Sequence, residues 1–122
     1  MDTLSMQDKM RIVQEIVPGK QITLAHIIAN PDEVLYRKLG LDTSVEQAIG
    51  AIGILTISPS ETVIIAGDIA IKASGAELGF VDRFSGSLIF TGTVSEVQAA
   101  MEALLDYVKD TLGYTVCKIS KT

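Results

Sequence analysis

The sequence has few of the residues from which metal and catalytic centres are built. Its 122 residues include one cysteine, Cys117, and one histidine, His26. A zinc-like site needs three or four such ligands, so we expect no metal site. A single cysteine cannot form an internal disulfide, and residues 1–10 are polar and lack the apolar core of a secretory signal. Both observations indicate a cytosolic protein.

Clusters of positive charge and long apolar runs are also missing. Lysine and arginine together number 10 against 15 acidic residues, and the net charge is −5. Such a chain offers no surface for binding phosphates or an acidic membrane. Asp68 and Lys72 interrupt the longest apolar run, which stays below the roughly 18 residues of a membrane span. We therefore expect neither nucleic acid nor a membrane as partner.

Recognisable catalytic or cofactor-binding patterns do not occur. Gly50, Gly53 and Gly67 follow neither phosphate-loop nor dinucleotide-binding spacing, so no cofactor is expected. His26 alternates with aliphatic residues, which favours a hydrogen-bonded histidine in the core or at a subunit contact over a catalytic one. Cys117 has only Lys118 as a basic neighbour, which favours a structural role over a nucleophilic one. We predict that the protein is not an enzyme.

Hydrophobic periodicity, turn residues and caps predict an α+β domain. Thr93 and Glu96 have the spacing of a capping box, and Gly86 can take the positive φ of a tight turn over residues 83–86. Asn30 and Pro31 are expected to start a helix that Gly40 ends. The expected strands cover residues 11–17, 21–29, 51–57, 77–82 and 87–93, with some strand character at 114–119, and the longer helices cover 63–73 and 94–112.

The helix expected over residues 63–73 is apolar around its whole circumference. Asp68 and Lys72 are its only charged residues. One sheet can cover one side of a helix, so something else has to bury the other side. Identical copies supply that cover most simply, because a homo-oligomer buries the same surface on every subunit.

After a short N-terminal extension, the order of elements is strand, helix, strand, helix, strand, strand, helix. Moving the first strand and helix to the end gives β-α-β-β-α-β-α, which is the ferredoxin-like split βαβ plan with one added helix. We therefore expect a four-stranded antiparallel sheet flanked by helices. Residues 1–20 form an extension with a short strand, and residues 21–122 form one domain.

Four segments carry a recognisable pattern in a fixed order: residues 17–21, 24–26 with 29–31, 51–56 and 79–86. Together they resemble the circularly permuted shell proteins of bacterial microcompartments (BMC) for ethanolamine and propanediol utilisation. The resemblance covers nearly the whole chain and implies a permuted BMC domain. It also implies a structural protein of the bacterial cytoplasm, whose hexamers tile a shell around an enzyme set. Partners would be its own copies, other shell proteins and encapsulated enzymes, while the pathway (ethanolamine, propanediol, choline or another) stays open.

The same resemblance assigns roles to three groups of residues. The turn of Arg83, Phe84, Ser85 and Gly86 would line the central pore, and Lys72 would lie at the hexamer edge. The arginine that often accompanies this lysine is missing, since residues 90–93 stand in its place. Six copies of the N-terminal strand would gather into a small parallel barrel that closes the pore. Its residues are Ile12, Val13, Gln14, Glu15, Ile16 and Val17.

Two other functions are compatible with this plan. A small-molecule-binding regulatory domain on a similar sheet would bind an anionic ligand with residues 83–86. Asp82 and Arg83 could also be a catalytic acid and an anion binder, although polar residues at a hairpin tip are the commoner case. A small hydrolase would need a positioned nucleophile, which the sequence does not offer.

Overall fold

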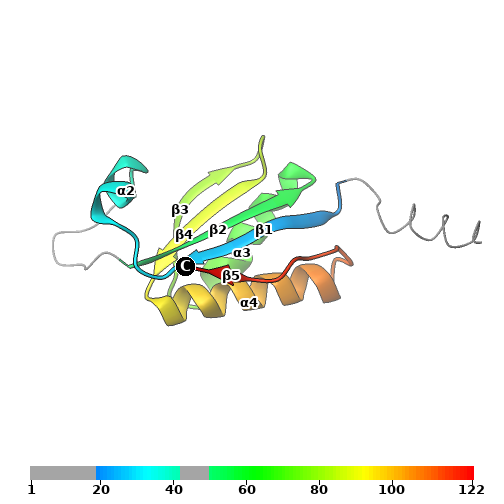
Figure 1. Ribbon diagram of the computed structural model, residues 1–122. Coiled ribbons are helices and arrows are strands. Elements are labelled where there is room, and N and C mark those ends of the chain that lie inside the picture. Colours follow the sequence, from blue (N-terminus) through cyan, green and yellow to red (C-terminus); the bar gives the residue numbers. More distant parts are fainter. Residues whose placement is uncertain (1–18, 42–49) are drawn as a thin grey trace, which may run out of the picture.

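Two helices pack on one face of a five-stranded sheet in the computed structural model, which describes residues 19–41 and 50–122 (Figure 1). The elements follow the predicted order, with one short strand added at the end. They are β1 (Gln21–Ile28), α2 (Glu33–Lys38), β2 (Ala51–Ser58), the 3₁₀ turn η1 (Ser60–Thr62), α3 (Val63–Ala73), β3 (Glu77–Asp82), β4 (Ser87–Gly92), α4 (Val94–Asp110) and β5 (Ser120–Lys121).

The sheet has the strand order β3-β4-β2-β1-β5. The pairs β3–β4, β4–β2 and β2–β1 are antiparallel, whereas β5 is parallel to β1. The predicted sheet of four antiparallel strands is therefore wrong in one respect, because a fifth strand pairs with the free edge of β1. Within the described residues, β3 and β5 are the two outer strands, at opposite ends of the sheet.

The fifth strand comes from the C-terminal segment, residues 114–122. Gly113 (φ +75°) follows α4, and the chain then returns along β1. The backbone N–H of Thr122 donates to the Ile27 carbonyl at 2.9 Å, and the Ala29 N–H donates to the Thr122 carbonyl at 2.8 Å. Strand character was expected at 114–119 but occurs at Ser120–Lys121, where the edge of β1 supplies the partner.

The start of α2 also differs from the expectation. Asp32, rather than Asn30, is the N-cap, and its carboxylate accepts the Val34 N–H at 2.8 Å. The helix therefore begins two residues later than expected, and Pro31, expected as its first residue, is buried before the cap. Gly40 (φ +73°) follows the helix end, as predicted.

The core lies mainly between the sheet and the helix pair α3 and α4. Alternate residues of β2, such as Leu55 and Ile57, are fully buried in this layer, while Ile52 points to the opposite face and packs under α2. Gly53 leaves room for Phe90 of β4 and Val97 of α4, because a Cβ there would lie 2.6 Å from the Phe90 ring and 3.0 Å from a Val97 methyl group. None of the helices in residues 19–41 and 50–122 is long and apolar enough to cross a membrane.

Candidate functional site

The outer surface of α3 and β3 carries a group of exposed large apolar side chains, which we call the apolar edge. α3 buries Val63, Ala66, Gly67 and Ala70 against its own chain, while Ile64 on the opposite side is 55% exposed. Three of these side chains lie on β3, in which every residue except the last is exposed. The expectation that one sheet cannot cover α3 is confirmed for the described residues. The apolar edge consists of Ile64, Ile65, Ile71, Leu78 and Val81 on the α3 side, with Phe80 on the other face of β3.

The hairpin between β3 and β4 ends in a turn that its own residues hold in shape. The Asp82 carboxylate accepts hydrogen bonds from the Phe84 N–H and the Ser85 hydroxyl, each at 2.9 Å. These two bonds lower the pKa of Asp82, because they favour its charged form. Asp82 is thus a structural acceptor in the turn.

Gly86 closes this turn and ties it to β2. Its φ is +77°, its N–H donates to the Asp82 carbonyl at 2.8 Å, and its carbonyl accepts the Ile57 N–H at 2.9 Å. A Cβ at this position would lie 2.1 Å from the Ile57 carbonyl oxygen. The prediction that Gly86 takes a positive φ in this turn is therefore confirmed.

Arg83 and Phe84 form the outermost part of the hairpin tip. The guanidinium carbon of Arg83 lies 5.1 Å from the centroid of the Phe84 ring, which is within cation–π range. Phe84 is 81% exposed. A tip that presents a bare aromatic ring and a cation is suited to contacts outside its own subunit.

His26 is satisfied by the C-terminal segment. Its Nδ1 lies 2.6 Å from the Ser120 hydroxyl and its Nε2 lies 2.9 Å from the Thr122 hydroxyl. Which ring nitrogen donates depends on the tautomer. This is the hydrogen-bonded histidine that the sequence favoured, although its partners in the C-terminal segment could not be predicted from the pattern around residue 26.

Lys72 lies in the last turn of α3, where its ammonium group is 2.9 Å from the Asp68 carboxylate. Both side chains are exposed, so the pair contributes little to stability. The predicted role of Lys72 at a hexamer edge stays a prediction.

The predicted pore-closing strand, residues 12–17, lies outside the described residues.

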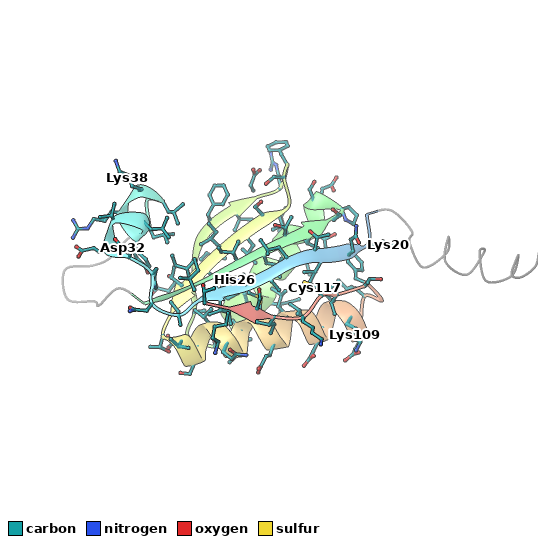
Figure 2. All side chains as sticks on the ribbon, viewed as in Figure 1. Lys20, His26, Asp32, Lys38, Lys109 and Cys117 are labelled. Carbon is teal, nitrogen blue, oxygen red and sulfur yellow. The ribbon has the colours of Figure 1, made fainter. Side chains whose placement is uncertain are left out.

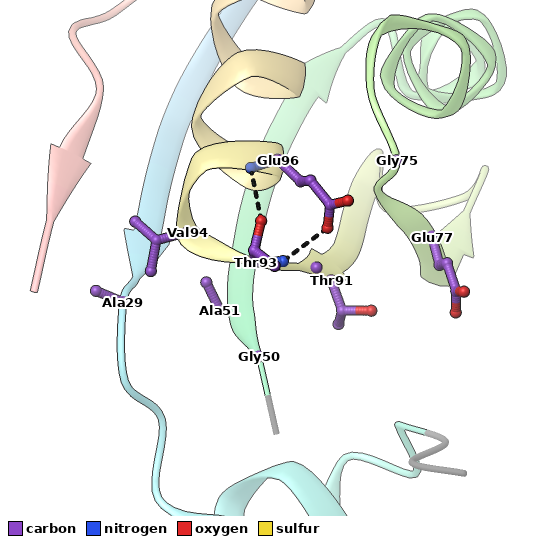
Figure 3. Close-up of a pocket in the computed structure, with 10 residues that line it drawn as sticks. Ala29, Gly50, Ala51, Gly75, Glu77, Thr91, Thr93, Val94 and Glu96 are labelled. Atoms are coloured by element: carbon purple, nitrogen blue, oxygen red, sulfur yellow. Dashed lines mark hydrogen bonds between the residues drawn. The ribbon is translucent and has the colours of Figure 1, made fainter. Parts of the chain in front are cut away.

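A cavity of about 510 Å³ lies where α4 begins, at the end of the sheet away from the hairpin tip (Figure 3). Its most polar feature is the capping box, in which Thr93 Oγ1 accepts the Glu96 N–H at 3.1 Å and the Glu96 carboxylate accepts the Thr93 N–H at 2.9 Å. The predicted capping box is confirmed, and one oxygen of Glu96 is committed to it. Among the residues that the structure describes, no cluster of three potential metal ligands occurs.

Comparison with known proteins gives consistent matches. The family model of the BMC domain matches residues 51–120. The chain is 48% identical over 115 residues to the bacterial microcompartment shell protein EutS of Escherichia coli (strain K12), covering 94% of this chain and 99% of that one. It is 50% identical over 112 residues to the shell protein PduU of Salmonella typhimurium (strain LT2), covering 92% and 93%.

The fold also matches a solved structure closely. A structure described as a flat hexamer of CutR has a TM-score of 0.79 and 46% sequence identity, covering 87% of this chain and 86% of that chain. In the sequence, the apolar circumference of α3 was the signal that pointed to such self-association. The apolar side chains of β3 and the return of the C-terminal segment gave no comparable signal.

Proposed function

The chain belongs to the BMC-domain family of microcompartment shell proteins, and from this premise we propose that six copies of it close into a ring that tiles such a shell. The relatives are structural shell proteins, so the chain is a structural protein and not an enzyme. They give no support to a small-molecule-binding regulatory domain. The proposed place of the ring is the shell of a microcompartment in the bacterial cytoplasm.

The apolar edge is the observation that carries this proposal. Burying a fully exposed large aliphatic side chain contributes about 1.5–3 kcal/mol, so each half-exposed residue of the edge contributes about 1 kcal/mol when a neighbour covers it. Six such residues on every subunit supply enough free energy to offset the entropy that the subunits lose on association. A ring of six subunits repeats the same contact six times, so that the apolar edge of every copy is covered.

A charged substitution within the apolar edge tests the ring. Ile64→Asp would bury an unpaired carboxylate at the contact and should convert the ring to subunits of 13.0 kDa, the mass of one chain. Val34→Asp is the matched control, because Val34 is an equally apolar, exposed residue on α2. Light scattering of both variants decides the matter. Rings of unchanged mass in Ile64→Asp would contradict the proposal.

The order of the elements supports a circular permutation, which we include in the proposal. The BMC model begins its match at residue 51, the first residue of β2, so β1 and α2 precede the matched region. β1 nevertheless pairs with β2 inside the same sheet. We therefore treat residues 21–122 as one permuted domain, preceded by an extension over residues 1–20.

The hairpin tip is proposed to line the pore of the ring. Arg83, Phe84 and Ser85 are exposed at the end of the β3–β4 hairpin, Gly86 closes the turn against β2, and a ring would present six copies of this tip. Lys72, at the opposite end of α3, would lie at the outer edge and face neighbouring tiles. Other shell proteins and encapsulated enzymes are the proposed partners at those outer surfaces.

Residues 12–17 are proposed to close the pore by forming a barrel of six short strands. A strand of this length is unstable alone but can be stable when a ring aligns six copies. Deleting residues 1–17 should therefore leave the hexamer intact while opening its pore. Loss of the hexamer in this deletion, seen by sedimentation, would count against a purely pore-closing role.

A further inference from the structure

The cavity of about 510 Å³ at the start of α4, which we call the α4 cavity, has small residues in its wall that leave its polar groups accessible (Figure 3). A Cβ at Gly75 or at Gly92 would collide with the Glu96 carboxylate, so glycine at both positions gives this carboxylate its room. The connection that contains Gly75 is tied to α4, because the Ser74 hydroxyl donates to the Glu96 carbonyl at 2.9 Å. The cavity is therefore built into the fold of one subunit.

The Thr91 side chain is a buried polar group in the wall of the α4 cavity. Thr91 is 9% exposed, and its hydroxyl makes no hydrogen bond to another residue of the described part of the chain. Figure 3 shows this side chain pointing from β4 into the space between Gly50 and Glu77. Glu77 is its cross-strand partner on β3, so the two side chains lie side by side on one face of the sheet. A buried hydroxyl without a partner is costly, and a molecule in the cavity would supply that partner.

The α4 cavity is lined by two carboxylates, those of Glu77 and Glu96, and by no basic side chain of the residues that the structure describes. One oxygen of Glu96 is held in the capping box, and the other has no hydrogen-bond donor within residues 19–41 and 50–122. Lys20 lies at the start of β1 and Lys109 in the last turn of α4, both at the opposite end of the domain (Figure 2). The partial positive charge at the start of α4 offsets only part of the two negative charges. The cavity therefore favours a cation.

The volume and the acceptors of the α4 cavity decide which cation fits. Calcium takes six to eight oxygen ligands, and the described residues contain no cluster of three potential metal ligands. A primary ammonium group instead has three N–H donors. Glu77, Thr91 and Glu96 offer three acceptors to match them. A volume of about 510 Å³ is also in the range of cavities that hold small organic molecules.

We propose that the α4 cavity binds the ammonium group of a small organic amine. Glu77, Thr91 and Glu96 accept its N–H groups, and the aliphatic side chains of Ala29 and Val94 in the same wall contact its carbon chain. None of these residues belongs to the apolar edge. The site therefore goes beyond the proposed ring and does not depend on it.

Titration of the full-length chain with ethylammonium chloride tests this site. Calorimetry in phosphate buffer at pH 7 and constant ionic strength measures the Kd. Tetramethylammonium is the matched control ligand, because it carries the same charge but has no N–H donor. Hydrogen bonds to charged groups contribute enough for ethylammonium to bind at least about tenfold more tightly than tetramethylammonium.

Substitutions in the wall of the cavity should weaken the binding of ethylammonium in proportion to the group removed. Thr91→Val keeps the shape of the side chain and removes the hydroxyl, so the Kd should rise about tenfold. Glu77→Gln removes an exposed charge and should raise it about threefold. Thr56→Val and Glu61→Gln are the matched controls, because both residues lie outside the cavity, and they should leave the Kd unchanged.

Three results would overturn the amine site: no binding of ethylammonium, equal affinity for the two ligands, or an unchanged Kd in Thr91→Val. If Thr91→Val does not fold, Glu96→Gln decides. Glutamine keeps the capping box but removes the charge, so the Kd should rise about tenfold, and an unchanged Kd would contradict the site. Light scattering of the same samples reports the ring separately. A monomeric chain that binds ethylammonium would reject the ring and support the site.

Discussion

Gly86 meets two separate steric requirements at the hairpin tip. Its positive φ is costly for any residue with a Cβ, and the space where that Cβ would lie is occupied by the Ile57 carbonyl. Gly113 has nearly the same φ, +75°, but nothing lies within 4 Å of its would-be Cβ. Comparing these two glycines therefore distinguishes the cost of backbone strain, which both share, from the cost of steric contact, which arises only at Gly86.

Gly86→Ala should therefore destabilise the fold more than Gly113→Ala. We expect about 1 kcal/mol for Gly113→Ala from the left-handed backbone alone, and about 3 kcal/mol or more for Gly86→Ala because β2 and the hairpin must also move apart. Urea unfolding at one fixed chain concentration measures both changes. If the two substitutions lowered the free energy of unfolding equally, the steric role of the Ile57 carbonyl would be contradicted.

Asp82 makes the hairpin tip sensitive to acid. Its pKa is lowered in the folded protein by the Phe84 N–H and the Ser85 hydroxyl, so its contribution to stability is present above about pH 4 and is lost as the pH falls through the lowered pKa. Asp82→Asn should unfold at a lower temperature than the unsubstituted chain at pH 7. The difference should shrink below about pH 4, and a difference that stays constant from pH 7 to pH 3 would contradict this account.

At the scale of elements, the C-terminal segment protects the edge of β1. Two backbone hydrogen bonds of Thr122 and the hydroxyl partners of His26 hold it there. Without this cover β1 would be an exposed edge strand, which promotes pairing with other chains.

Removing residues 120–122 should lower the free energy of unfolding by about 2 kcal/mol, because a few partly exposed hydrogen bonds are lost. It should also increase aggregation. His26→Gln serves as the control, because it changes the side-chain bonds and keeps the backbone pairing of β5. Thermal unfolding with light scattering compares the two variants. Aggregation in His26→Gln equal to that of the truncated chain would show that edge protection is not the cause.

The elements that the sequence predicts well depend on local signals. The capping box of Thr93 and Glu96, the turn at Gly86 and the apolar spacing of α4 all act within a few residues. β5 was missed because it is two polar residues long and exists only through its pairing with β1. The start of α2 was misplaced because Asn30 and Asp32 are both good N-cap residues, and the local pattern does not decide between them.

At the scale of the whole molecule, the two ends of the sheet have different chemistry. One end presents bare aliphatic and aromatic side chains of α3 and β3, and the other presents a groove beside β5. The sequence could predict that α3 needs a cover, since its apolar residues surround the helix. It could not predict the groove, which forms only when residues 116–119 fold back against α4.

The central claim is that identical copies cover the apolar edge, and the mass of the unsubstituted chain in solution tests it most directly. Sedimentation or light scattering at micromolar concentration should give six times the 13.0 kDa of one chain. Single chains of 13.0 kDa that stay soluble and unassociated at that concentration would contradict the account.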